Sequence, residues 1–308
     1  MMEIKVLVMA KKNLYNKLTR DEEEKMIICV VGPTGVGKTK MSVELAKKYN
    51  GIIVNCDAMQ VYKDMDIATA KVTEEEKEGV KHYLLDICDV KDNYTIYDYQ
   101  KDCRKILEEN KDKNIIIVGG SGLYLKAALF DYRFEEEKEN KTYDDLTNEE
   151  IYKLAIKKDE NMNIHINNRK RLIRFLNRKQ KDVVEAKLLY KNVYFIGLTT
   201  NREKLYDIIN RRVDKMVSNG ILEEAKKFYD MKLDCKSLKT GIGYKELFKY
   251  FNNELSKEEA LDLIKKNSRH YAKRQYTFFN NQMDIKWFNV NYDNFNDTIK
   301  EVEEYIES

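Results

Sequence analysis

GPTGVGKT, residues 32–39, decides the fold class of this 308-residue chain. It fits the pattern GxxxxGK[ST], follows the apolar run MIICVVG (26–32) and precedes a segment, 38–49, with apolar residues at helical spacing. A strand, a glycine-rich loop and a helix in this order form a phosphate-binding P-loop. The glycines let backbone amides turn towards phosphate oxygens, and the helix N-terminus adds a favourable dipole.

Every residue of this loop is therefore expected to line a bound phosphate: Gly32, Pro33, Thr34, Gly35, Val36, Gly37, Lys38 and Thr39. Lys38 is expected to supply a positive charge, and the Thr39 hydroxyl is the predicted ligand of Mg²⁺. The loop alone does not name a reaction. A GTPase should also carry NKxD, which is absent, and a kinase or ATPase needs an acid at a strand end, for which Asp86 is the best candidate.

The rest of the chain alternates apolar strands with helices, which predicts an α/β fold with a parallel sheet covered on both faces. Further strands are expected at 51–57, 82–88, 114–120, 193–200 and 285–290. Helices are expected at 97–110, 202–218, 221–230, 243–251, 256–281 and 294–306. The carboxyl ends of parallel strands share one edge of the sheet, where ligands bind.

The length suits about two domains at ~150 residues each. Residues 131–150 carry nine acidic against three basic residues, and 157–181 then carry nine Lys and Arg against two acids. We therefore predict a P-loop core formed by 26–130 and 193–308, with a helical insertion at 131–192. Residues 1–25 are expected to be an extension, too short in apolar content for a signal peptide.

The overall composition excludes few functions. The net charge is only +3, so nucleic-acid binding would need local basic patches. Five scattered cysteines without a CxxC pair favour buried, reduced thiols in the cytoplasm, and the three histidines lack zinc-ligand spacing. No apolar run reaches the ~18 residues of a membrane span, and we expect a monomer with no membrane association.

Two further segments fall at the predicted edge. Asp57 ends the strand 51–57 in the run NCDAMQVY, and Ser121 follows the strand 114–120 in VGGSGLY. A carboxylate there can bind Mg²⁺ or accept a proton, and on position alone a metal or structural role is favoured. Paired glycines allow close approach to a ligand, and Ser121 offers either a hydroxyl to that ligand or a helix N-cap.

Taken together, the motifs resemble those of the tRNA dimethylallyltransferases, also called tRNA isopentenyltransferases. The similarity runs in order and spacing from about residue 26 to 290. The matching segments are GPTGVGKT (32–39), DAMQVYKDMDIATAK (57–71), HYLLDI (82–87), VGGSGLY (118–124), HINNRKRLIR (165–174), RRVDKMVSNGILEEA (211–225), GIGYKEL (241–247) and AKRQYTFF (272–279).

The chain departs from the family pattern at four of these positions. Ala58 replaces a serine beside Asp57, Ala68 replaces a glycine, Ser121 replaces a threonine and Ile166 replaces a proline. The segment 131–165 is short and matches weakly. These differences affect the expected tRNA contacts more than the expected reaction.

The resemblance implies transfer of a dimethylallyl group from dimethylallyl diphosphate to the exocyclic amine of the adenosine 3′ of the tRNA anticodon. It assigns the P-loop to the diphosphate that leaves, and it reverses the preference above by making Asp57 the general base. Lys38 and Arg212, with Arg211 as a second cation, would stabilise the diphosphate with Mg²⁺. Ser121 would hydrogen-bond the amine or the diphosphate, and Gln60 would help to hold the base.

The same resemblance implies a tRNA interface. An adenosine stacked in the anticodon loop must be flipped out to reach the sheet edge. The residues expected to contact tRNA are Asp57, Ala58, Met59, Gln60, Ser121, Lys170, Arg171 and Arg174. The wider basic run Arg169–Lys181 would contact phosphates, and the helix bearing Arg269, Lys273, Arg274, Tyr271, Tyr276 and Phe278 would face the loop.

Two alternatives remain open at this stage. A nucleoside or nucleotide kinase would use the same P-loop for phosphoryl transfer from ATP. A P-loop protein that binds RNA without catalysis would bind tRNA tightly and modify no base.

Overall fold

The computed structural model describes residues 25–134, 141–177 and 187–308. Within them the chain forms two compact units: residues 25–130 with 188–308, and the described residues between 131 and 187. The insertion expected at 131–192 thus ends earlier, because Leu188 bridges to Phe130 and the Leu189 amide donates to the Leu129 carbonyl in the first unit. Residues 1–24 of the expected extension, and Arg178, Lys179 and Lys181 of the basic run, lie outside the described residues.

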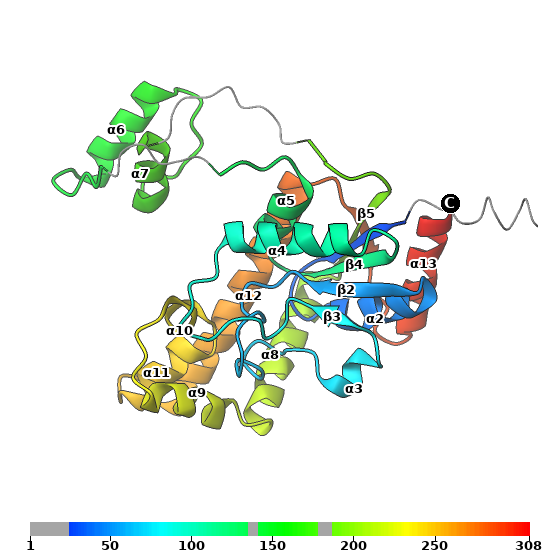
Figure 1. The fold of residues 1–308 in the computed structure, drawn as a ribbon. Helices are drawn as coiled ribbons and strands as arrows, with labels where there is room; N and C mark the ends of the chain where they lie inside the picture. The colour runs from blue at the N-terminus through cyan, green and yellow to red at the C-terminus, as the bar shows by residue number, and fades with distance from the viewer. Residues whose placement is uncertain (1–24, 135–140, 178–186) are drawn as a thin grey trace, which may run out of the picture. The chain divides into compact units, whose positions relative to one another are not determined.

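The first unit contains a parallel sheet of six strands in the order β3-β2-β4-β1-β5-β6, flanked by helices (Figure 1). The strands are β1 (Ile27–Val31), β2 (Gly51–Asn55), β3 (His82–Tyr83), β4 (Asn114–Gly119), β5 (Val193–Thr199) and β6 (Lys286–Asn289). This arrangement is the P-loop α/β fold that the sequence predicts. The loops that follow β1, β2 and β4 therefore leave the sheet at the same edge.

Helices cover the sheet and extend the C-terminal part of this unit. They are α2 (Lys38–Lys48), α3 (Glu74–Lys77), α4 (Ile96–Glu109), α5 (Gly122–Leu129), α8 (Arg202–Ser218), α9 (Ile221–Asp230), α10 (Lys236–Thr240), α11 (Tyr244–Phe251), α12 (Lys257–Gln282) and α13 (Phe295–Glu307). No helix among the described residues is both long enough and apolar enough to cross a membrane.

The buried strands explain why both faces of the sheet are covered. Alternate residues of a strand point to opposite faces. Ile28 and Val30 join the core beneath α2 and α13, whereas Cys29 and Val31 join the core beneath α4 and α5. All five cysteines are buried and free.

A third core holds the loop that follows β2 against the C-terminal helices. Tyr62 and Met65 of that loop pack with Ile221 of α9 and with Leu238 and Tyr244 of the next two helices. The helix-rich C-terminal part therefore supports the edge of the sheet at which Asp57 lies.

The strand expected at 82–88 is wrong beyond Tyr83. Leu84 and Asp86 adopt φ values of 61° and 54°, which ends the strand after two residues. Left-handed backbone is unfavourable for a leucine, so tertiary contacts of this turn must stabilise it.

The second unit contains α6 (Asn148–Lys158) and α7 (Arg169–Asn177). Its small core consists of Ile151, Ala155, Met162, Ile164 and Leu172. Thr147 caps α6 in a reciprocal capping box with Glu150. A core of this size leaves most side chains of the unit on its surface.

Candidate active site

The P-loop connects β1 to the first turn of α2. Gly35 and Gly37 adopt φ values of 92° and 86°, conformations that residues with a Cβ rarely adopt. Gly37 is the N-cap of α2, with no side-chain hydrogen bond to the helix. The first amides of α2 thus remain available to an anion, as the sequence predicts for this loop.

Lys38 begins α2 and folds back over the loop. Its Nζ donates to the carbonyl oxygens of Gly32 (3.0 Å) and Pro33 (2.7 Å). Burial, and then the charge of Arg212, lower the pKa of Lys38 to about 7 against the opposing charge of Asp57. The ammonium is therefore held in place before any ligand binds, in a setting that favours an added negative charge.

Arg212 of α8 joins the P-loop to the loop after β2. It donates to the Thr34 hydroxyl and to the Thr69 carbonyl (3.2 Å). Its Nε is buried without a hydrogen-bond partner in the part of the chain described. Burial lowers the pKa of Arg212, and the charges of Asp57 and Glu76 raise it. A buried guanidinium with an unused N–H is a natural partner for a phosphate group.

Arg211 does not join this cluster. It is exposed and pairs with Asp207 one turn earlier on α8. Of the two adjacent arginines in the motif, the structure brings only Arg212 to the P-loop.

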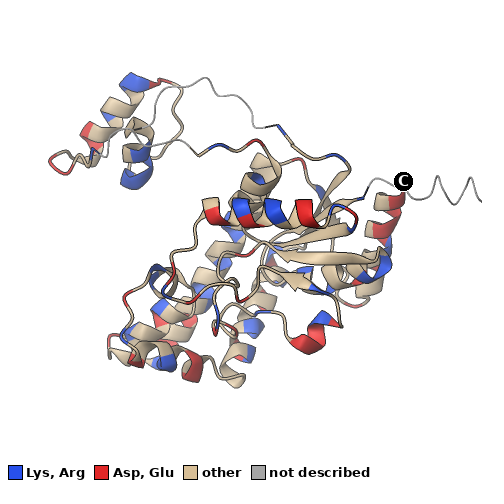
Figure 2. Ribbon diagram, viewed as in Figure 1, with Lys and Arg blue, Asp and Glu red and all other residues tan. Residues whose placement is uncertain are grey.

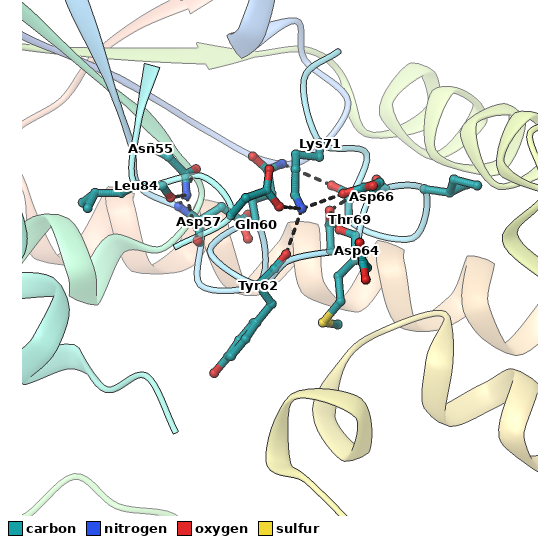
Figure 3. A network of polar contacts seen from close by, with 12 residues as sticks. Asn55, Asp57, Gln60, Tyr62, Asp64, Asp66, Thr69, Lys71 and Leu84 are labelled. Carbon is teal, nitrogen blue, oxygen red and sulfur yellow. Dashed lines mark hydrogen bonds and ion pairs between the residues drawn. The ribbon is translucent and has the colours of Figure 1, made fainter. Parts of the chain in front are cut away.

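Asp57 lies two residues after the end of β2, and its half-buried carboxylate acts on both cations of the P-loop. Asn55 holds its backbone, because the Asn55 Oδ1 accepts from the Asp57 amide (3.1 Å) and the Nδ2 donates to the carbonyls of Asp57 (3.2 Å) and Leu84 (2.9 Å) (Figure 3). One carboxylate oxygen accepts from the Met59 amide at 2.9 Å. Asp57 is thus fixed at the sheet edge with oxygen lone pairs still unused.

Ser121 follows β4 and touches the loop that carries Asp57. Its hydroxyl accepts from the Ala58 amide at 3.0 Å and makes no capping bond to α5. The phenol of Tyr271 is buried next to Ser121, whose hydroxyl lowers the pKa of that phenol. Burial and then the charge of Asp57 raise the pKa of Tyr271, so this phenol stays neutral beside the carboxylate. Ser121 therefore positions the Asp57 loop in addition to offering a hydroxyl to a ligand.

The loop between Asp57 and Lys71 is anchored by a buried ammonium. The side chain of Lys71 is only 6% exposed, and its Nζ contacts Asp66 (2.6 Å), the Tyr62 carbonyl (2.8 Å) and Asp86 (Figure 3). Asp86, the acid that a kinase would need for Mg²⁺, is thus engaged in an ion pair that fixes the turn after β3.

Glu224 of α9 anchors the same loop from the C-terminal part. Its carboxylate accepts from the amides of Asp66 (3.0 Å), Ile67 (2.7 Å) and Ala68 (3.1 Å), and from the Tyr244 hydroxyl (2.6 Å). Four donors on one carboxylate hold this segment rigidly. The two motifs, 57–71 and 211–225, are therefore in direct contact through Glu224.

Gln60 differs from its expected role. Its Nε2 donates to the carbonyls of Thr69 (3.2 Å) and Ala70 (3.4 Å) and so closes the loop. The amide of Met59 and the side chain of Asn55 hold Asp57 instead.

A magnesium ion would find one protein ligand at the expected place. Thr39 is exposed on the first turn of α2, and no group of three His, Cys, Asp or Glu side chains in the described ranges could hold a metal. Mg²⁺ keeps several waters and commonly binds through substrate phosphates. The residues therefore fit an ion that arrives with a diphosphate.

The second unit presents the predicted basic residues on α7. Figure 2 shows basic residues on α7. Lys170, Arg171 and Arg174 are exposed, and none forms an ion pair with another described residue. Arg169 has a structural role, since it donates to the Tyr143 (2.6 Å) and Leu146 (2.7 Å) carbonyls. Three free cations on one short helix suit contacts with nucleic-acid phosphates.

Sequence reasoning missed Asn55 and Gln275. Both stand in motifs quoted above or next to them, but their partners are distant in sequence: Gln275 bonds Thr34, 241 residues away. The only available signal was a polar residue in an otherwise apolar pattern, at the end of strand 51–57 and on the buried side of the helix 256–281.

The fold and the site together define a P-loop protein that places a carboxylate, a hydroxyl and two cations at one edge of a parallel sheet. The chain matches the family described as "IPP transferase" over residues 60–282. It is 44% identical over 295 residues to the tRNA dimethylallyltransferase of Bacillus mycoides, covering 87% of this chain and 91% of that protein. The protein of the same name from Anoxybacillus flavithermus is 42% identical, covering 91% and 96%.

Solved structures agree. The tRNA isopentenylpyrophosphate transferase of Bacillus halodurans superposes with a TM-score of 0.72 at 39% identity, covering 92% of this chain and 96% of that one. A eukaryotic dimethylallyltransferase acting on tRNA gives a TM-score of 0.71 at 28% identity, covering 86% and 74%. This chain belongs to the tRNA dimethylallyltransferase family. The predicted enzyme class is confirmed, and the kinase alternative is not supported.

Proposed function

We propose that this protein transfers a dimethylallyl group from dimethylallyl diphosphate to the exocyclic amine of the adenosine 3′ of the anticodon in tRNA. The products are isopentenyladenosine and diphosphate, and the reaction takes place in the cytoplasm. The observation that carries the proposal is that Arg212 joins the P-loop, through the Thr34 hydroxyl, to the loop that begins at Asp57, through the Thr69 carbonyl. A base and a binding site for an anionic leaving group therefore lie within reach of each other.

The reaction needs three events that these residues support. The allylic C–O bond breaks and its electron pair goes to the diphosphate, where Lys38, Arg212 and the amides of the P-loop stabilise the growing charge. The nitrogen lone pair forms the new C–N bond. Asp57 accepts the proton that leaves the amine, a contribution of roughly 10²–10⁴-fold.

Mg²⁺ bound at Thr39 would add charge stabilisation on the leaving diphosphate. Ser121 would contact the amine or the diphosphate with the hydroxyl proton that its bond to Ala58 leaves free. Ala58, Met59 and Gln60 are half-buried in the loop beside Asp57 and would contact the flipped nucleotide. Lys170, Arg171 and Arg174 would bind phosphates of the anticodon stem-loop.

The proposal is tested by digesting tRNA to nucleosides after incubation with protein, Mg²⁺ and dimethylallyl diphosphate. Mass spectrometry of the nucleosides should detect adenosine heavier by one dimethylallyl group in place of a hydrogen, and mass spectrometry of ribonuclease fragments of the same tRNA should place it 3′ of the anticodon. A parallel reaction with ATP as the only donor should give no phosphoryl transfer. Tight tRNA binding with an unmodified adenosine would refute the proposal.

A further inference from the structure

Gln275 connects two loops that the proposed reaction uses separately. It lies on α12 and is 4% exposed. Its Oε1 accepts from the amide of Thr34 in the P-loop (2.9 Å), and its Nε2 donates to the carbonyl of Gly120 (3.2 Å), the residue before Ser121. The same carboxamide thus joins the phosphate cradle after β1 to the hydroxyl-bearing loop after β4.

The contact is close on the side of Gly120. A Cβ added to Gly120 would lie 1.7 Å from the Gln275 Nε2, so only glycine lets the carboxamide reach the backbone here. This contact explains why a glycine stands at Gly120, the second of the pair in VGGSGLY. On the same helix, Phe278 lies against Gly122, where an added Cβ would come within 2.1 Å of its ring, so α12 contacts this loop at two points.

Both polar groups of Gln275 are used within the protein. Its oxygen takes the Thr34 amide, which is therefore directed away from a phosphate, and its nitrogen takes a carbonyl. With 4% exposure and one bond at each end of its carboxamide, Gln275 acts mainly on the protein's own backbone. Its effect on the reaction must pass through the relative position of the two loops.

We propose that Gln275 is a positioning residue that sets the separation between the diphosphate in the P-loop and the acceptor amine at Ser121 and Asp57. The inference rests on the proposed function. Ser121 in turn holds the Ala58 amide, so the chain of contacts runs from the P-loop through Gln275 and Ser121 to the residue after the base. Displacing reacting groups by about 1 Å can lower a rate by about 10²-fold.

This role predicts that a substitution of Gln275 lowers the rate of transfer without lowering the affinity for diphosphate. Substitution should leave most of the diphosphate site intact, because Lys38 is held by the carbonyls of Gly32 and Pro33, and Arg212 keeps its bond to the Thr69 carbonyl even if Thr34 shifts. The transfer step should fall, since it needs both loops in register. A residue that only filled the core would instead lower thermal stability and all ligand affinities together.

The test compares Gln275→Leu, which removes both bonds, with Gln275→Glu, which keeps the acceptor for Thr34 and loses the donor to Gly120. Gln282→Leu is the matched control, an exposed glutamine on the same helix that contacts only Lys126 among the described residues. Single-turnover transfer at saturating substrates, affinity for inorganic pyrophosphate, melting temperature and hydrogen exchange of the Thr34 amide are measured for each.

We expect transfer by Gln275→Leu to fall about 10²-fold, transfer by Gln275→Glu to fall less, and pyrophosphate affinity to stay within about threefold. Exchange at Thr34 should accelerate in Gln275→Leu only. Wild-type transfer by Gln275→Leu, or a parallel loss of pyrophosphate affinity, would overturn the assignment. If the wild-type protein transfers no carbon, the proposed function fails, and pyrophosphate binding with Thr34 exchange still decides whether Gln275 forms the bridge. If the leucine variant does not fold, Gln275→Glu decides by the same measurements.

Discussion

The cations of the sheet edge and those of the helical unit differ in what holds them. Lys38 and Arg212 are half-buried, hydrogen-bonded to backbone or hydroxyl oxygens, and have lowered pKa values. Lys170, Arg171 and Arg174 are exposed and make no ion pair within the described residues. Fixed cations in a dry site stabilise charge that grows at one place, whereas exposed ones attract a polyanion from a distance.

This difference explains why the two regions carry different amounts of supporting structure. At the sheet edge, three residues, Asn55, Lys71 and Glu224, anchor the loop that carries Asp57 and the turn after β3. In the helical unit, Arg169 and Lys158 bond backbone carbonyls, whereas Lys170, Arg171 and Arg174 are exposed. Substitutions should therefore act on the rate in the first region and on salt-dependent affinity in the second.

The largest effect is expected for Asp57→Asn. The amide keeps the size of the side chain but cannot accept the proton, so transfer should fall by roughly 10²–10⁴-fold with tRNA affinity near that of the wild type. Single-turnover transfer and a tRNA binding titration measure the two quantities. Asp64→Asn, an exposed position in the same loop that pairs with Lys227, is the control and should transfer normally. Undiminished turnover in Asp57→Asn would remove this residue as the base.

A smaller effect, confined to binding, is expected when Lys170, Arg171 and Arg174 are all changed to alanine. If each contacts one phosphate, the slope of log K against log salt should shrink by about 3. The transfer rate at saturating tRNA should not change. The control is Lys153→Ala with Lys157→Ala on α6, two exposed cations of the same unit. An equal loss of slope in both sets would show that no defined face of this unit binds tRNA.

The pH dependence of pyrophosphate binding tests whether the sheet edge, one side of this comparison, lowers the pKa of its lysine. The free protein has Lys38 with a pKa of about 7, and a bound anion should raise it. Binding therefore takes up a proton above about pH 7, and affinity should fall by up to tenfold per pH unit there. Lys38→Arg, which stays charged, corrects for the titration of pyrophosphate itself. Calorimetry in buffers of different ionisation enthalpy should find extra proton uptake in the wild type, and equal uptake in both proteins would contradict the assignment.

Strand ends were predictable from the sequence, and the contacts that hold them were not. The run NIIIVGG predicts β4 and places Ser121 beyond its end, because an apolar strand that ends at a glycine can be recognised from neighbouring residues alone. The turn at Leu84 escaped prediction, since YLLDI looks extended and the groups that hold its left-handed backbone, among them Asn55 and Lys71, come from other segments. Gln275 escaped for the same reason, as its partners lie on other segments of the chain.

The smallest effect is expected for Ala58→Ser, which restores the serine that the family pattern places beside the base. The Ala58 amide already donates to Ser121, so the loop geometry does not depend on the missing hydroxyl. An added hydroxyl next to Asp57 contributes at most about one hydrogen bond, and transfer should change by less than about fivefold. Steady-state transfer by the two proteins measures it. A rate of transfer more than tenfold above that of the wild type would show that Ala58 slows this chain. The departure from the family pattern that matters most would then lie beside the base and outside the exposed tRNA contacts.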